Sequence, residues 1–140
     1  MSRIHIPAEF RRLVIERALA CCEYCLLHQD HTHFSHQIDH IIAVKHGGLT
    51  VLENLALACL ECNLAKGSDL ATLLAGNLVA LFNPRQQNWR EHFAFDQEMI
   101  VGLTQTGLAT INLLQINAPE RTAERRRLIA LGLYPPQWIF

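Results

Sequence analysis

The sequence lacks any apolar run long enough to cross a membrane. Its longest uninterrupted apolar stretches are much shorter than the ~20 residues that a membrane-spanning helix needs. No apolar segment of the secretory type follows Met1, and we therefore expect a cytoplasmic protein. An excess of charge is missing too, because 12 Lys and Arg face 13 Asp and Glu, for a formal net charge of −1. Any binding of nucleic acid must therefore come from a local site and not from overall charge.

Internal repeats and low-complexity tracts are also missing. The chain has 140 residues, of which 50% are hydrophobic and 18% are charged. This composition is typical of a globular protein and argues against wholesale disorder. The length fits one ordinary domain, or a small motif domain with a helical extension.

The five cysteines do not indicate a disulfide framework, because their number is odd and cytosolic disulfides are rare. Four of them form two C-x-x-C pairs, Cys22 with Cys25 and Cys59 with Cys62. Each pair offers two thiolates to one ion, and two pairs complete a tetrahedral sulfur site that suits zinc. Such a site has no open position, so we expect a structural zinc. The alternatives are buried cysteines that share this spacing by chance, or Cys21 as a ligand in place of Cys22.

Hydrophobic periodicity and turn residues predict a mixture of short helices and strands. In chain order we expect a helix from Pro7 to Leu19, a polar loop over 28–36, a strand or hairpin over 34–44 that ends at Gly47-Gly48, a short helix over 62–66 stopped by Gly67, a short helix over 70–74 before a turn at Gly76-Asn77, strands over 92–96 and 99–103, and helices over 106–114 and 119–131. A second region begins at Asn83-Pro84-Arg85.

Several polar residues lie between or directly after the cysteine pairs. They are Asp39, His40, Asn54, Asn63 and Lys66. Taken singly, each is more typical of a satisfied surface pair, a turn residue or a solvated charge. Their order within a zinc frame carries more information than any one of them.

That order resembles the HNH endonuclease family. The matching string, over about residues 20–68, is Cys22-Glu23-Tyr24-Cys25, Ile38-Asp39-His40-Ile41, Gly47-Gly48, Glu53-Asn54-Leu55 and Cys59-x-x-Cys62-Asn63-x-x-Lys66-Gly67. The resemblance implies an α+β fold of the ββα-metal type, in which a β-hairpin and a helix grip one divalent metal ion. We therefore expect an HNH nuclease core over residues 1–82, which includes an N-terminal helix and the zinc knuckles, and a C-terminal α/β extension over 83–140 that packs on it.

The resemblance also implies a role for each polar residue. His40 matches the general base, and Asp39 matches a carboxylate ligand of the divalent ion. Asn54 matches the residue that holds the loop presenting His40. Asn63 stands where many members have His, as the second metal ligand, which makes this the His-Asn-Asn variant. Lys66 lies one helical turn later on the same face and could reach a phosphate.

The chemistry of these residue types agrees with phosphodiester hydrolysis. A neutral imidazole near pH 7 can activate water, and a divalent ion can act as Lewis acid on the phosphate. Two hard oxygen ligands favour magnesium or manganese over zinc at the catalytic site. One difficulty is that neighbours in a regular strand point to opposite faces, so Asp39 and His40 would need a twist, a bulge or a strand end.

Several features of the sequence allow more than one interpretation. Arg121 and Arg125 share a helix face and could contact a nucleic-acid backbone, although a solvated face neutralised by Glu120 and Glu124 is the preferred interpretation. The substrate is expected to be DNA, with RNA open, and cutting both strands would require two sites, as in a homodimer. The alternative functions are a non-catalytic, zinc-dependent nucleic-acid-binding module and a structural interaction protein. The other histidines of this region fit a histidine-rich polar loop better than a second metal site, and we place them outside the site: His28, His31, His33, His36 and His46.

Overall fold

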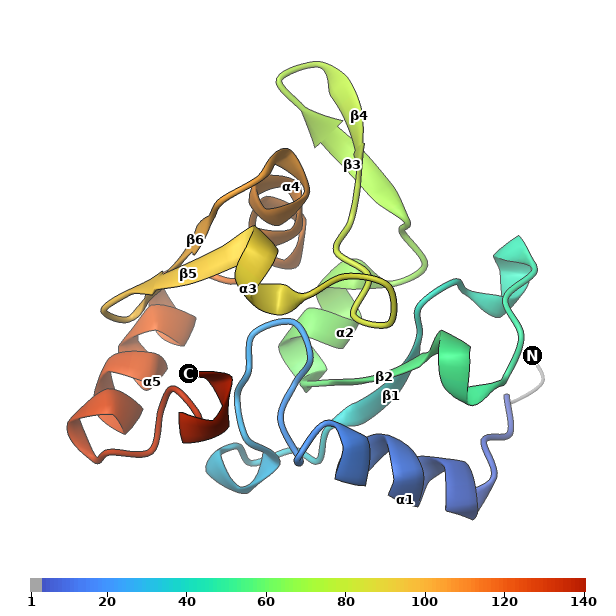
Figure 1. Cartoon of the computed structure of the whole chain (residues 1–140), viewed down its shortest axis with the longest axis horizontal. Helices are drawn as coiled ribbons and strands as arrows, with labels where there is room; N and C mark the ends of the chain where they lie inside the picture. Colours follow the sequence, from blue (N-terminus) through green and yellow to red (C-terminus); the bar gives the residue numbers. More distant parts are fainter. Residues whose placement is uncertain (1–3) are drawn as a thin grey trace.

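A computed structural model describes residues 4–140 of the chain (Figure 1). Within these residues, five α-helices and three two-stranded antiparallel sheets make up an α+β fold, which confirms the expected class. The elements are α1 (Ala8–Arg17), β1 (Gln37–His40), β2 (Leu55–Ala58), α2 (Leu60–Lys66), β3 (Ala71–Leu74), β4 (Asn77–Ala80), α3 (Trp89–His92), β5 (Phe93–Asp96), β6 (Met99–Gly102), α4 (Gln105–Leu114) and α5 (Pro119–Ala130). Short 3-10 turns occupy several of the loops. No helix in the described part of the chain is long and apolar enough to span a bilayer.

The β1–β2 hairpin carries the centre of the predicted core. The two strands pair in regular antiparallel register, with Asp39 opposite Ala56 and His40 opposite Leu55. Every residue of β2 is buried. Helix α1 packs against β2 through a small cluster that includes Val14 and Leu57, while α2 contacts β1. The hairpin therefore lies between two helices.

Helix α1 begins where Pro7 ends the preceding extended segment. Pro7 is the N-cap, one position before the helix, and not its first residue as predicted. The helix also ends two residues earlier than expected, at Arg17, because Leu19 and Ala20 adopt left-handed φ values of 53° and 60°. This turn directs the chain into the first cysteine pair.

The segment after β1 is a loop, so the predicted strand to residue 44 is wrong beyond His40. A 3-10 turn over Val44–His46 ends at Gly47, whose φ is 91°. Gly48 lies so close to the backbone that an added Cβ would come within 1.7 Å of the Ile42 carbonyl oxygen. Glycine is therefore required at position 48, because the loop folds back onto its own start.

The predicted helix over 70–74 is also wrong. Residues Ala71–Leu74 form β3, which pairs with β4 across a turn in which Ala75 and Gly76 have φ values of 49° and 83°. Two consecutive left-handed residues make the tight turn that joins antiparallel strands, which explains why the predicted turn site closes a hairpin. Pairing with β4, together with packing against α4, overrides the local helical pattern.

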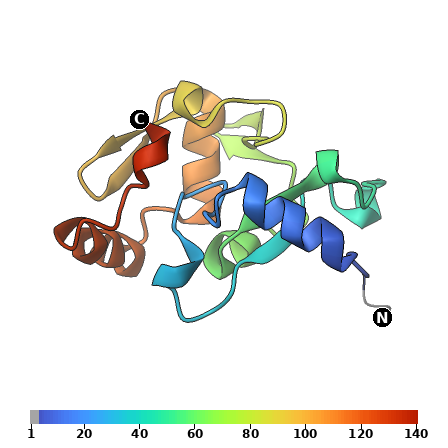
Figure 2. The same cartoon turned by 60° about the horizontal axis from the view of Figure 1, so that its bottom comes forward.

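The C-terminal part matches its predicted elements closely. The strands β5 and β6 and the helices α4 and α5 lie within two residues of the expected bounds. Helix α4 contacts α2, β3, β4 and β6, and so connects the two parts of the chain. In both views α5 lies toward one end of the molecule and the β1–β2 hairpin with α1 toward the other (Figure 1, Figure 2).

One hydrophobic core joins the two parts. It contains the four paired cysteines and Tyr24 together with residues beyond position 80, namely Leu81, Phe82, Trp89, Phe93, Ile100, Ile111, Leu114, Ile116, Leu128 and Tyr134. The division into domains at residue 82 stays a prediction. The C-terminal part does pack on the cysteine pairs, and the fold around them is therefore shared.

Candidate functional site

The four paired cysteines form one cluster of sulfur atoms. Their Sγ atoms all lie within 4.8 Å of one another, and every one of the four residues is buried. The Cys25 and Cys59 sulfurs are 3.7 Å apart. Zn–S bonds of ~2.3 Å in a tetrahedron place sulfurs about 3.8 Å apart, so the cluster has the dimensions of a zinc site. These cysteines can therefore bind a metal ion such as zinc.

Each pair has the geometry of a knuckle. The backbone N–H of Cys25 donates to the Cys22 sulfur at 3.4 Å, and that of Cys62 donates to the Cys59 sulfur at the same distance. Cys59 is also the N-cap of α2, so the helix starts at the site. Cys21 lies outside the cluster, and burial raises the pKa of its thiol to about 11. Cys22, not Cys21, completes the set.

Asp39 lies in the interior beside the first knuckle. Its carboxylate is 4% exposed and accepts a hydrogen bond from the Tyr24 hydroxyl at 2.9 Å. The Lys66 ammonium lies 3.2 Å from the same oxygen. Burial raises the pKa of Asp39, and the opposing effects of Lys66 and Tyr24 do not fully cancel this rise.

His40 points to different neighbours from Asp39, as the alternation along a strand requires. Its Nε2 lies 2.9 Å from the Thr50 hydroxyl oxygen, in the loop that follows β1. The side chain is half-buried, and burial lowers the pKa of the imidazole. The ring is therefore kept neutral to a lower pH than a free histidine. The strand register shows no bulge here, and β1 ends at His40 itself.

Asn54 holds the loop between the two strands. Its amide oxygen accepts from the N–H of Ile42, and its amide nitrogen donates to the carbonyls of Ile42 and Leu49, each at 2.9 Å. Leu49 directly precedes Thr50, the partner of His40. The hydrogen bonds of Asn54 thus fix the loop that carries Thr50.

Lys66 is buried, which differs from its expected place at a phosphate. The side chain is 2% exposed, and its ammonium donates to Asp39 and to the carbonyls of His40 and Ile41. A group enclosed in this way cannot reach a substrate without breaking an ion pair. The structure gives Lys66 the role of holding the end of β1 and its carboxylate.

Asn63 lies on α2, one helical turn before Lys66 and on the same face. Its side chain is half-buried, and Lys66 on the next turn touches Asp39. A carboxylate has about four acceptor positions, so Asp39 retains capacity beyond its bonds to Tyr24 and Lys66. Carboxylate and amide oxygens are the donors that Mg²⁺ or Mn²⁺ prefers, and the donor chemistry of Asp39 and Asn63 therefore fits a divalent ion.

Comparison with known protein families finds one similarity. Residues 22–69 match the family model described as HNH endonuclease. This segment, called the HNH segment from here on, is similar to that family over less than half of the chain. The match confirms the resemblance over 20–68 and ends just before β3, so the C-terminal extension lies outside it. No curated protein and no solved structure matches the chain.

Beyond the HNH segment, Arg121 contacts the cysteine cluster from α5. Its guanidinium donates to the Cys62 sulfur at 3.0 Å and to the carbonyls of Leu114 and Gln115. Burial lowers the pKa of Arg121, but the neighbouring cysteines outweigh this and raise it overall. Four thiolates around Zn²⁺ leave an excess of negative charge, and Arg121 lies where it offsets part of that charge.

Arg121 is half-buried and Arg125 is buried, so both interpretations of the Arg121–Arg125 face need correction. Arg125 is 3% exposed and donates to the carbonyls of Glu98 and Ile116 and to the Asn117 side chain. It is therefore neither positioned for a nucleic-acid backbone nor part of a solvated face. The next two residues of α5, Arg126 and Arg127, are exposed, and each pairs with a glutamate.

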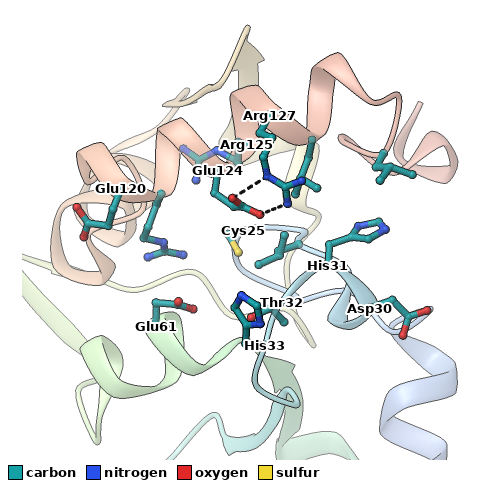
Figure 3. Close-up of a pocket in the computed structure, with 14 residues that line it drawn as sticks. Cys25, Asp30, His31, Thr32, His33, Glu61, Glu120, Glu124, Arg125 and Arg127 are labelled. Atoms are coloured by element: carbon teal, nitrogen blue, oxygen red, sulfur yellow. Dashed lines mark hydrogen bonds and ion pairs between the residues drawn. The ribbon is translucent and has the colours of Figure 1, made fainter.

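A cavity of about 580 Å³ lies between the histidine-rich loop and α5 (Figure 3). His31 and His33 line it from the loop, and Glu124 lines it from α5, where it pairs with Arg127. Asp39, His40 and Asn63 do not line it, so the cavity is separate from the polar residues of the HNH segment. In the described part of the chain, the four cysteines are the group of His, Cys, Asp and Glu side chains arranged to hold a metal.

Two residues that contact the predicted site, Tyr24 and Thr50, were not among the predicted site residues. Arg121 was predicted, but for contact with a nucleic-acid backbone and not with the cysteine cluster. Tyr24 lies inside the first cysteine pair, and its position there was the available signal. Nothing in the sequence connects Thr50 to His40 or Arg121 to Cys62, because those contacts depend on loop closure and on docking of α5.

Proposed function

We propose that the chain is a metal-dependent HNH endonuclease that hydrolyses phosphodiester bonds of DNA. The observation that carries the proposal is the match of residues 22–69 combined with His40, which stands half-buried at the end of β1 with its ring fixed by Thr50. RNA presents the same phosphate chemistry and stays open as a substrate. A homodimer would supply two sites for cutting both strands of a duplex.

In this proposal His40 is the general base. When its Nε2–H donates to the Thr50 hydroxyl oxygen, Nδ1 keeps a free lone pair that can accept a proton from water. Burial lowers the pKa of the imidazole, which keeps the base in its neutral form at neutral pH. Asn54 maintains this geometry through the three hydrogen bonds that close the loop.

Asp39 and Asn63 would hold a magnesium or manganese ion. Such an ion supplies Lewis-acid stabilisation of negative charge on the phosphate. The Lys66 ammonium and the Tyr24 hydroxyl orient the Asp39 carboxylate by donating hydrogen bonds to it. Cys22, Cys25, Cys59 and Cys62 would hold a structural zinc, which fixes the start of α2 and therefore the position of Asn63.

A non-catalytic, zinc-dependent nucleic-acid-binding module is the second candidate. The observation in its favour is the burial of Asp39, whose carboxylate is already bonded to Lys66 and Tyr24. A binder would require a free basic surface, and the near-zero net charge, the half-buried Arg121 and the buried Arg125 do not supply one. We therefore favour the enzyme.

Plasmid cleavage tests the proposal. Zinc-loaded protein is incubated with supercoiled DNA in the presence of Mg²⁺, Mn²⁺ or a chelator, alongside His40→Ala and His46→Ala. His46 is an exposed histidine in the same loop and serves as the matched control. We expect metal-dependent nicking that His40→Ala abolishes and His46→Ala retains, with native zinc content and circular dichroism in both. Cleavage by His40→Ala at the wild-type rate would remove His40 from its role.

A further inference from the structure

We infer that Tyr24 is a positioning residue that connects the cysteine cluster to the Asp39 carboxylate. The inference rests on the proposed function, in which Asp39 is a ligand of the divalent ion. It gives the first cysteine pair a second task beyond stability, which is to set the orientation of a ligand at the neighbouring site.

Tyr24 is held in place through both its backbone and its ring. Its backbone lies between Cys22 and Cys25, and its carbonyl accepts a hydrogen bond from the indole N–H of Trp89 at 2.9 Å. The residue is completely buried, and its ring packs edge-on against Phe82. A rigid ring in a closed environment has one available position. The cysteine pair and these contacts together therefore determine where the Tyr24 hydroxyl lies.

That hydroxyl is one of two donors that hold Asp39. It donates to Oδ2 at 2.9 Å, while the Lys66 ammonium lies 3.3 Å from Oδ1 and 3.2 Å from Oδ2. Lys66 is itself held by the Ile41 carbonyl at 3.1 Å. Two anchored donors fix the plane of the carboxylate. Hydrogen bonds of this kind orient ligands, and their loss typically costs about 10- to 100-fold in metal affinity.

The chain offers a matched pair of variants to test this role. Tyr24 and Tyr134 are its two tyrosines, and both are buried. The Tyr134 hydroxyl donates to the Cys25 carbonyl at 2.7 Å, on the same knuckle but not to Asp39. Tyr24→Phe and Tyr134→Phe each remove one buried hydroxyl from this knuckle and keep the ring. Only the first removes a bond to the proposed ligand.

The measurement is Mn²⁺ binding by zinc-loaded protein, followed by electron paramagnetic resonance of the free ion. We expect Tyr24→Phe to weaken Mn²⁺ binding by about tenfold or more while its zinc content stays native, and Tyr134→Phe to bind Mn²⁺ like the wild type. Equal affinity in Tyr24→Phe and the wild type would overturn the inference. So would an equal loss in both variants, because the effect would then be a general loss of packing.

Asp39→Asn separates this inference from the proposed function. If the wild type binds Mn²⁺, Asp39→Asn loses it and Tyr24→Phe does not, the metal site stands and the role of Tyr24 fails. If the wild type binds no Mn²⁺, the proposed metal site fails, and the role of Tyr24 fails with it.

A second measurement does not depend on the folding of Tyr24→Phe. In the Tyr134→Phe background, 3-fluorotyrosine supplied during expression labels position 24 alone. We expect the ¹⁹F resonance to shift on titration with Mg²⁺, and the shift to disappear when Asp39→Asn is added. A resonance that does not respond to Mg²⁺ in protein that binds the ion would overturn the inference.

Discussion

The cysteine cluster and the proposed metal site at Asp39 lie in the same HNH segment but are built in opposite ways. The four sulfurs lie within 4.8 Å of one another in a buried group, so an ion held there has all its ligands from the protein. Asp39 and Asn63 offer only two oxygens, and the half-buried His40 stands at the end of the same strand. An ion held there would keep most positions for water and phosphate. A closed site suits stability, and an open one suits reaction.

The largest effect is expected when the cysteine cluster is disrupted. Cys59→Ser should lose zinc and the cooperative thermal transition, because Cys59 lies in the core shared by both parts of the chain. Structural zinc contributes about 10–16 kcal/mol in zinc-finger peptides, which is as large as the whole stability of a typical domain. Zinc analysis and thermal circular dichroism measure this. Cys21→Ser is the control and should keep its zinc, since Cys21 is buried outside the cluster. A Cys59→Ser protein with native zinc content would contradict the assignment.

A smaller effect is expected when Lys66, the buried partner of the Asp39 carboxylate, is replaced. Lys66→Met leaves the buried Asp39 carboxylate without its cation, and we expect a loss of about 3–5 kcal/mol in urea unfolding at pH 7. Removing Lys66 also raises the pKa of Asp39 further, so the deficit should shrink as the pH falls and the carboxyl becomes neutral. Lys45→Met is the natural control, because Lys45 is the other lysine of the chain and is exposed. Equal stability of the two variants would show that the ion pair contributes nothing.

The contact between α5 and the closed site should have a moderate effect on zinc retention. Arg121→Gln removes the guanidinium beside the Cys62 sulfur, and we expect zinc to pass to a chromogenic chelator about tenfold faster. Arg126→Gln, on the same helix but exposed and paired with Glu98, should release zinc at the wild-type rate. Identical release from both variants would mean that Arg121 does not stabilise the thiolates.

The smallest expected effect concerns the base. Thr50→Val removes the hydroxyl beside His40, and loss of one hydrogen bond of about 1 kcal/mol corresponds to a roughly fivefold slower cleavage rate. Thr50→Ser keeps the hydroxyl and should restore the rate. Plasmid cleavage at native zinc content measures both. A Thr50→Ser protein as slow as Thr50→Val would assign the effect to packing of the methyl group and not to the hydrogen bond.

Local signals predicted the elements whose partners are close in the sequence. Gly67 ends α2 as expected, and the helices α4 and α5 appear where periodicity placed them. The helix predicted over 70–74 was wrong because the leucine-rich pattern of this segment fits a helix as well as a strand. Pairing with β4 makes it a strand. The prediction of a strand after His40 was wrong because of Asn54, which lies twelve residues after Ile42. Its side chain makes the hydrogen bonds to Ile42 that a strand partner would have made.

The spacing of the cysteines and the order of Asp39, His40, Asn54 and Asn63 were enough to predict an HNH segment and a four-sulfur site, because both signals lie in residue types at fixed positions along the chain. The environment of each side chain depended on the tertiary structure. Docking of α5 placed Arg125 in the interior and Arg121 on a sulfur. Packing of α2 against β1 turned Lys66 from an expected surface charge into the buried partner of Asp39. Burial and charge pairing arise only when distant segments meet, and no local pattern in the sequence carries that information.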